Sequence, residues 1–131
     1  FNYRSIELPK NLIFLSATLK GNEKNREEIS NYMKELNTVK NMAQPTKIKT
    51  SGSTFKNPID QTDKKVWELI RLSVPTETQY GDAVISEKHA NFFVNKKNAK
   101  SVDMKSLINF VKKKVKDKTG VKLDLEIVLV E

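Results

Sequence analysis

Polar side chains that local structure does not explain stand at a few separated points of the chain. The stretch SGSTFKNP, residues 51–58, places the hydroxyl of Ser53 directly after a glycine and the amide of Asn57 four residues later. A loop that only needs to turn would use the same small residues. The stretch alone therefore leaves three roles open: a binding module, a structural segment, or part of an enzyme.

Metal and triad chemistry find little support in the residue types. His89 is the only histidine, and there are no cysteines, so a zinc site lacks ligands. A serine nucleophile would need a G-x-S-x-G elbow, which is missing. We therefore expect His89 to act as a hydrogen-bonding residue of a loop rather than as a catalyst.

Phosphate-binding loops are also missing, because each glycine is isolated and neither G-x-G-x-x-G nor G-x-x-x-x-G-K-[ST] can be written. The four glycines are Gly21, Gly52, Gly81 and Gly120. This chain alone carries no dinucleotide fingerprint.

The net charge of +8 and the pI near 9.6 favour anionic partners, such as phosphate esters, nucleic acid or acidic membranes. Several lysines fall on one expected helix, which is equally typical of a solvated face: Lys112, Lys113, Lys114, Lys116 and Lys118. Phe92 and Phe93 are adjacent, so on a strand only one could stack on a base, and we expect no nucleic-acid binding. The longest apolar run, LIFL, cannot span a membrane.

The first part of the chain predicts a strand and a helix. Leu12–Leu19, LIFLSATL, is an apolar run typical of a buried strand. Asn25 predicts a helix start, with Glu28 in capping-box position. Apolar residues at helical spacing follow, namely Ile29, Tyr32, Met33 and Leu36. The pattern fades near Asn37, and residues 40–50 are expected to be a linker around Pro45.

The remainder predicts an α+β fold with helices on one face of a sheet. A loop or short strand at residues 51–58 is followed by a helix from Thr62 or Asp63 to about Leu72. Two strands are then expected, at 81–85 and 92–94. The last elements are a helix from Ser101 that ends at Gly120 and a strand from Val121 to Leu129. The buried stripe of the last helix comprises Met104, Leu107, Ile108, Val111 and Val115.

Three stretches together resemble one enzyme family. SGSTFKNP, SEKHANF at 86–92 and GVKLDLEIVLV at 120–130, in this order and spacing, resemble the UDP-N-acetylenolpyruvoylglucosamine reductases, in the subtype without an extra substrate-covering loop. FNYRS at 1–5 and QP at 44–45 also match. The resemblance implies that residues 1–47 are the end of an FAD-binding domain and that residues 48–131 are a substrate-binding domain. Since the chain starts at Phe1 rather than methionine, we expect a fragment.

The resemblance also implies an activity. Members of the family use NADPH to reduce FAD, and the flavin then reduces UDP-N-acetylglucosamine enolpyruvate to UDP-N-acetylmuramate for peptidoglycan synthesis. The implied location is the bacterial cytoplasm, with a monomer favoured and the FAD site mostly outside this chain. The alternative is a basic binding domain without an enzymatic role, or a decayed remnant of such an enzyme.

Residue roles follow from the resemblance by position. Ser53 would protonate the substrate carbon next to the one that receives hydride, and Arg4 would pair with the substrate carboxylate. Glu126 would act at the same carboxylate or enolate region. The implied substrate-binding residues are Asn57, Tyr3, Lys40, His89 and Asn91. One departure is SVPTE at 73–77, where relatives carry a glycine-containing A-G-L-x-G stretch.

Overall fold

The computed structural model describes residues 3–4, 6–9, 11–46 and 48–130. The chain divides into a first unit, Phe1–Val39, and a second unit, Lys40–Glu131. The predicted domain boundary follows Lys47, which lies outside the described residues, as do Phe1, Asn2 and Ser5 of the FNYRS stretch. The assignment of 1–47 and 48–131 to two domains therefore stays a prediction.

Helix α1, Arg26–Ala43, starts where the sequence predicts. The side-chain oxygen of Asn25 accepts a hydrogen bond of 2.8 Å from the backbone N–H of Glu27, which caps the helix. The helix continues beyond the predicted end near Asn37. Residues 37–43 contain neither glycine nor proline, and Pro45 is the first residue that opposes helical structure before it.

The predicted strand Leu12–Leu19 is wrong. The structure gives these residues no regular element, and the side chain of Leu15 is 93 % exposed. A strand needs a neighbour for its backbone N–H and C=O groups, and within the described part of the chain nothing pairs with this stretch. The apolar residues of α1 are exposed as well, and none of its residues is buried.

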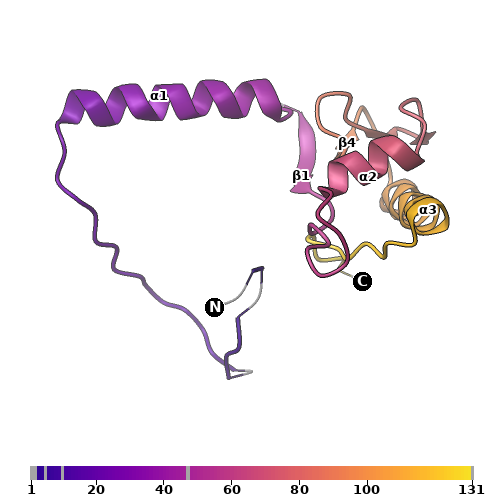
Figure 1. The fold of residues 1–131 in the computed structure, drawn as a ribbon, viewed down its shortest axis with the longest axis horizontal. Coiled ribbons are helices and arrows are strands. Elements are labelled where there is room, and N and C mark those ends of the chain that lie inside the picture. Colours follow the sequence, from indigo (N-terminus) through magenta and orange to yellow (C-terminus); the bar gives the residue numbers. More distant parts are fainter. Residues whose placement is uncertain (1–2, 5, 10, 47, 131) are drawn as a thin grey trace. The chain divides into compact units, whose positions relative to one another are not determined.

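The second unit confirms the α+β fold. Its four strands form one antiparallel sheet in the order β1-β4-β3-β2. Their bounds are β1 Lys49–Ser53, β2 Gln79–Tyr80, β3 Ala83–Ile85 and β4 Phe92–Asn95. The helices α2, Val66–Ser73, and α3, Ser101–Thr119, pack against each other (Figure 1). Strand β2 was not predicted.

The core lies between the sheet and the two helices. Phe93 and Ile85 of the sheet join the cluster that α2 and α3 complete. The predicted stripe of α3 is confirmed for its buried members Leu107, Ile108, Val111 and Val115, while Met104 is partly buried. The predicted helix end at Gly120 is also confirmed, because this glycine has φ 76° and its N–H bonds to the carbonyl of Lys116.

The predicted final strand, Val121–Leu129, is wrong as a regular element. Val121 and Leu123 are buried, but the only pairing described for this segment is an isolated bridge between Phe55 and Leu125. The side chain of Gln61 takes the place of a neighbouring strand: its amide donates to the carbonyl of Lys122 and accepts from the N–H of Lys122, both at 2.9 Å. We call this arrangement, a side-chain amide that bonds both backbone groups of one residue, an amide clamp.

Candidate active site

A β-bulge positions Ser53 at the end of β1. Thr50 pairs with Val94 and Ser53 with Phe92, so β1 uses one extra residue between these pairs. Gly52 lies in the bulge with φ 86°, and a Cβ atom there would meet nothing within 4 Å. Glycine is therefore required for its backbone conformation and not for space. Directly paired residues share a face of the sheet, so Ser53 lies on the face of Phe92, opposite the helices.

Glu126 lies on the backbone segment next to Ser53. The N–H of Glu126 donates to the carbonyl of Thr54 at 2.9 Å, and the N–H of Lys56 donates to the carbonyl of Asp124 at 2.9 Å. Both Ser53 and Glu126 are partly exposed. The structure thus brings the predicted proton donor and the predicted glutamate onto adjoining segments, although they are far apart in sequence.

Asn91 forms a second amide clamp, on Phe55. The residues on either side of Phe55 bond the segment of Glu126, and Asn91 approaches Phe55 from the opposite side. Its Oδ1 accepts from the N–H of Phe55 at 3.0 Å, and its Nδ2 donates to the carbonyl of Phe55 at 2.8 Å. Its own carbonyl accepts from the N–H of Thr54 at 2.8 Å. Asn91 is 3 % exposed, so its predicted role as a substrate-binding residue has little surface to act through.

His89 precedes this clamp in the loop between β3 and β4. Its ring packs edge-on against Phe92 at 4.9 Å between centroids, and its Nδ1 accepts from the N–H of Asn91 at 3.3 Å. Burial lowers the pKa of His89 below its usual value of 6.5, the positive charge of Arg71 lowers that pKa further, and a backbone hydrogen bond opposes both effects. The lowered pKa favours the neutral imidazole at pH 7, and the contact of Nδ1 with the N–H of Asn91 favours the tautomer with its proton on Nε2.

Asn57 caps α2 from outside the helix. Its Oδ1 accepts from the N–H of Val66, the first helical residue, at 3.0 Å. The helix starts at Val66, later than the predicted Thr62 or Asp63. The amide that the resemblance assigns to substrate binding thus has a structural hydrogen bond as well.

Tyr3 and Arg4 lie in the first unit and contact each other. The guanidinium carbon of Arg4 lies 5.8 Å from the centre of the Tyr3 ring, and the backbone of Arg4 has φ 56°. Lys40 lies in α1 and is exposed. Within the second unit, hydrogen bonds connect the segments that carry Ser53, His89, Asn91 and Glu126.

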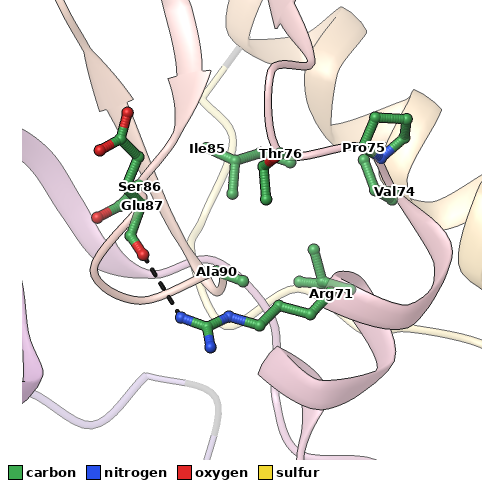
Figure 2. A pocket seen from close by; sticks show the side chains of 9 residues that line it. Arg71, Val74, Pro75, Thr76, Ile85, Ser86, Glu87 and Ala90 are labelled. Carbon is green, nitrogen blue, oxygen red and sulfur yellow. Dashed lines mark hydrogen bonds between the residues drawn. The ribbon is translucent and has the colours of Figure 1, made fainter.

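The stretch SVPTE closes α2 without a glycine. Val74 has extended backbone angles, φ −127° and ψ 130°, and its N–H bonds to the carbonyl of Ile70. Val74, Pro75 and Thr76 line a small cavity of about 20 Å³ (Figure 2), a volume that suits about one water molecule. Arg71 reaches across it and donates to the carbonyl of Glu87 at 3.4 Å. The end of α2 therefore uses extended backbone angles that any residue can adopt and needs no glycine.

The described residues include neither a metal-binding cluster nor a membrane-spanning helix. Among them, no group of histidine, cysteine, aspartate or glutamate side chains is arranged to hold a metal ion. In the same part of the chain, no helix combines the length and apolarity that crossing a membrane requires.

Residues 44–130 match the family model of the UDP-N-acetylenolpyruvoylglucosamine reductase C-terminal domain. The chain belongs to this family. It is 63% identical to the UDP-N-acetylenolpyruvoylglucosamine reductase of Pelagibacter ubique (strain HTCC1062), over 97% of this chain and 42% of that protein. The reductase of Rickettsia bellii (strain RML369-C) is 43% identical, over 97% of this chain and 41% of that protein.

The crystal structure of the UDP-N-acetylenolpyruvylglucosamine reductase from Thermus caldophilus has a similar fold. It superposes with a TM-score of 0.62 at 32% sequence identity and covers 80% of this chain but 35% of that chain. The family resemblance and the fold class predicted from the sequence are thereby confirmed. The chain spans about two fifths of the length of the curated relatives.

Proposed function

We propose that this chain supplies the substrate-binding domain and the proton donor of an FAD- and NADPH-dependent reductase. The reaction is the reduction of UDP-N-acetylglucosamine enolpyruvate to UDP-N-acetylmuramate for peptidoglycan synthesis, in the cytoplasm of a bacterium and with the enzyme as a monomer. The observation that carries the proposal is the bulge that fixes Ser53 beside the segment of Glu126, in a chain of this family.

Ser53 would protonate the carbon that does not receive hydride. A serine hydroxyl is a weak acid, so the reaction needs its oxygen held at a fixed place while the developing enolate is stabilised. The bulge at Gly52 and the hydrogen bonds of Thr54 on both sides support such a fixed place. Glu126 would act at the carboxylate or enolate region from the adjoining segment.

The remaining residues would bind the substrate. Arg4 would pair its guanidinium with the two oxygens of the substrate carboxylate, which the planar fork of arginine suits. His89, neutral and protonated on Nε2, would offer a hydrogen-bond donor to the sugar nucleotide. Asn57, Tyr3 and Lys40 complete the proposed substrate contacts, and the excess of lysine suits the diphosphate.

The glycines of the second unit all have local structural roles. Gly52, Gly81 and Gly120 have positive φ and serve a bulge, a hairpin turn and a helix end, respectively. None belongs to a phosphate-binding loop. We therefore infer that the FAD site lies mostly outside this chain.

The test uses a reductase of the relatives' full length that carries this segment. Ser53→Ala is expected to leave flavin reduction by NADPH intact and to slow flavin reoxidation by the enolpyruvyl substrate by ~10²-fold, the scale for losing a positioned acid. Ser51→Ala, which removes an exposed hydroxyl from the same strand, is the matched control and should leave both steps unchanged. Stopped-flow flavin absorbance measures both steps. Rapid reoxidation of the Ser53→Ala enzyme by substrate would refute the role of Ser53.

A further inference from the structure

Asn91 bonds backbone groups of Phe55 that the neighbouring segments leave unpaired. Phe55 and Leu125 form a bridge whose two hydrogen bonds belong to their neighbours, Thr54 to Glu126 and Lys56 to Asp124. In such a pair the N–H and C=O of Phe55 point away from Leu125. They would be unpaired in the protein interior, because Phe55 is 1 % exposed and β4 begins only at Phe92.

The side chain of Asn91 replaces the missing strand partner. Its amide offers an acceptor oxygen and a donor NH2 group, the two functions that a peptide group of a further strand residue would present. It bonds both backbone groups of Phe55, and the carbonyl of Asn91 bonds Thr54. Three hydrogen bonds from one residue therefore hold the two residues that directly follow Ser53.

We propose that Asn91 is a positioning residue of the reductase: its amide clamp on Phe55 holds the Thr54–Lys56 segment, and through it sets Ser53 relative to Glu126. This inference rests on the proposed function and assigns Asn91 a different role from substrate binding. Asn91 is only 3 % exposed and both ends of its amide are bonded, which leaves little surface for a ligand.

The chain offers a matched control at the other end of β4. Asn95 also forms an amide clamp: its Oδ1 accepts from the N–H of Ala99 at 2.9 Å, and its Nδ2 donates to the carbonyl of Ala99 at 3.4 Å. Val94 and Asn95 pair with the start of β1, away from Ser53. Asn95→Ala therefore removes the same type of clamp without touching the Ser53 segment.

The experiment measures steady-state reduction of the enolpyruvyl sugar nucleotide by the full-length enzyme. Asn91→Ala is expected to lower kcat by ~10²-fold with little change in KM, because a displacement of about 1 Å of a reacting group has this effect. Asn95→Ala is expected to lower the unfolding midpoint while kcat stays near that of the wild type. Hydrogen exchange at the Phe55 amide should accelerate in Asn91→Ala alone.

The variant Asn91→Asp should recover kcat at low pH, a recovery that a role in stability alone would not produce. Ionised, its carboxylate would oppose the Phe55 carbonyl. Protonated, its carboxyl would have one donor and one acceptor, like the amide. Burial favours the protonated form, so the kcat of Asn91→Asp relative to wild type should rise as pH falls. The charged and titratable residues on the segments around this site are Lys56, His89, Asp124 and Glu126, with Arg71 near His89, and the wild type at each pH accounts for them.

The outcomes separate the two proposals. A rise in KM at unchanged kcat in Asn91→Ala would mean that Asn91 binds substrate, and an unchanged kcat and KM would mean a role in stability alone; either result overturns the positioning role. A wild-type enzyme that does not reduce the enolpyruvyl substrate would overturn the proposed function and this inference with it.

Discussion

Similar apolar residues are buried in the second unit of the chain and exposed in the first. In the second unit, Phe93 is 1 % exposed and packs edge-on against Phe55 at 5.8 Å between ring centres. In the first unit, Phe14 lies in an equally apolar stretch and is 70 % exposed. The difference teaches that an apolar run becomes a buried element only where other segments supply its packing and backbone partners.

The largest expected effect comes from comparing two substitutions of phenylalanine by alanine. Phe93→Ala should destabilise the 131-residue chain by about 3–5 kcal/mol, because it empties a close-packed core position. Phe14→Ala should change the free energy of unfolding by less than about 0.5 kcal/mol, as is usual for surface changes. Urea unfolding measures both. A large cost at Phe14 would contradict the open packing of the first unit.

The same contrast applies to two glycines. Gly81 has φ 52°, and a Cβ there would lie 2.7 Å from the carboxylate of Asp103, which accepts from the N–H of Lys100 and caps α3. Gly81→Ala should therefore cost about 2–3 kcal/mol, from left-handed backbone strain and a disturbed cap. Gly21→Ala, in the first unit, meets nothing within 4 Å and should be nearly neutral. Equal unfolding midpoints for the two variants would refute this difference.

The smallest expected effect concerns pH. Because the pKa of His89 is lowered on folding, the unfolded chain binds a proton more readily, and the free energy of unfolding should fall as pH drops below about 6.5. The fall should level off below the pKa of the folded state. His89→Gln should remove this part of the pH dependence, since His89 is the only histidine. Unfolding curves between pH 7.5 and pH 5, set by the range around the usual histidine pKa, measure it.

If wild type and His89→Gln lose stability in parallel over this range, the burial of His89 does not matter to folding. A parallel loss would also weaken the assignment of a neutral imidazole at the site. The expected difference is small because the ring remains partly exposed.

The sequence by itself determined the elements that depend on local pattern. The apolar stripe of α3, its end at Gly120, the start of α1 at Asn25 and the paired strands around SEKHANF follow from short-range periodicity and capping. The motifs also identified the family, because SGSTFKNP and SEKHANF carry residue types at fixed spacing.

Only the tertiary structure decided which apolar stretches have partners and which amides are structural. Leu12–Leu19 and Val121–Leu129 have strand-like patterns, but strand structure requires a neighbour that no local pattern reveals. Gln61, Asn91 and Asn95 are ordinary polar residues in the sequence, yet each holds both backbone groups of another residue, and for Gln61 and Asn91 that residue is far away in the sequence. For the buried Phe55 the physical reason is the same as for the strands: a buried backbone group must be bonded, and the fold decides by which partner.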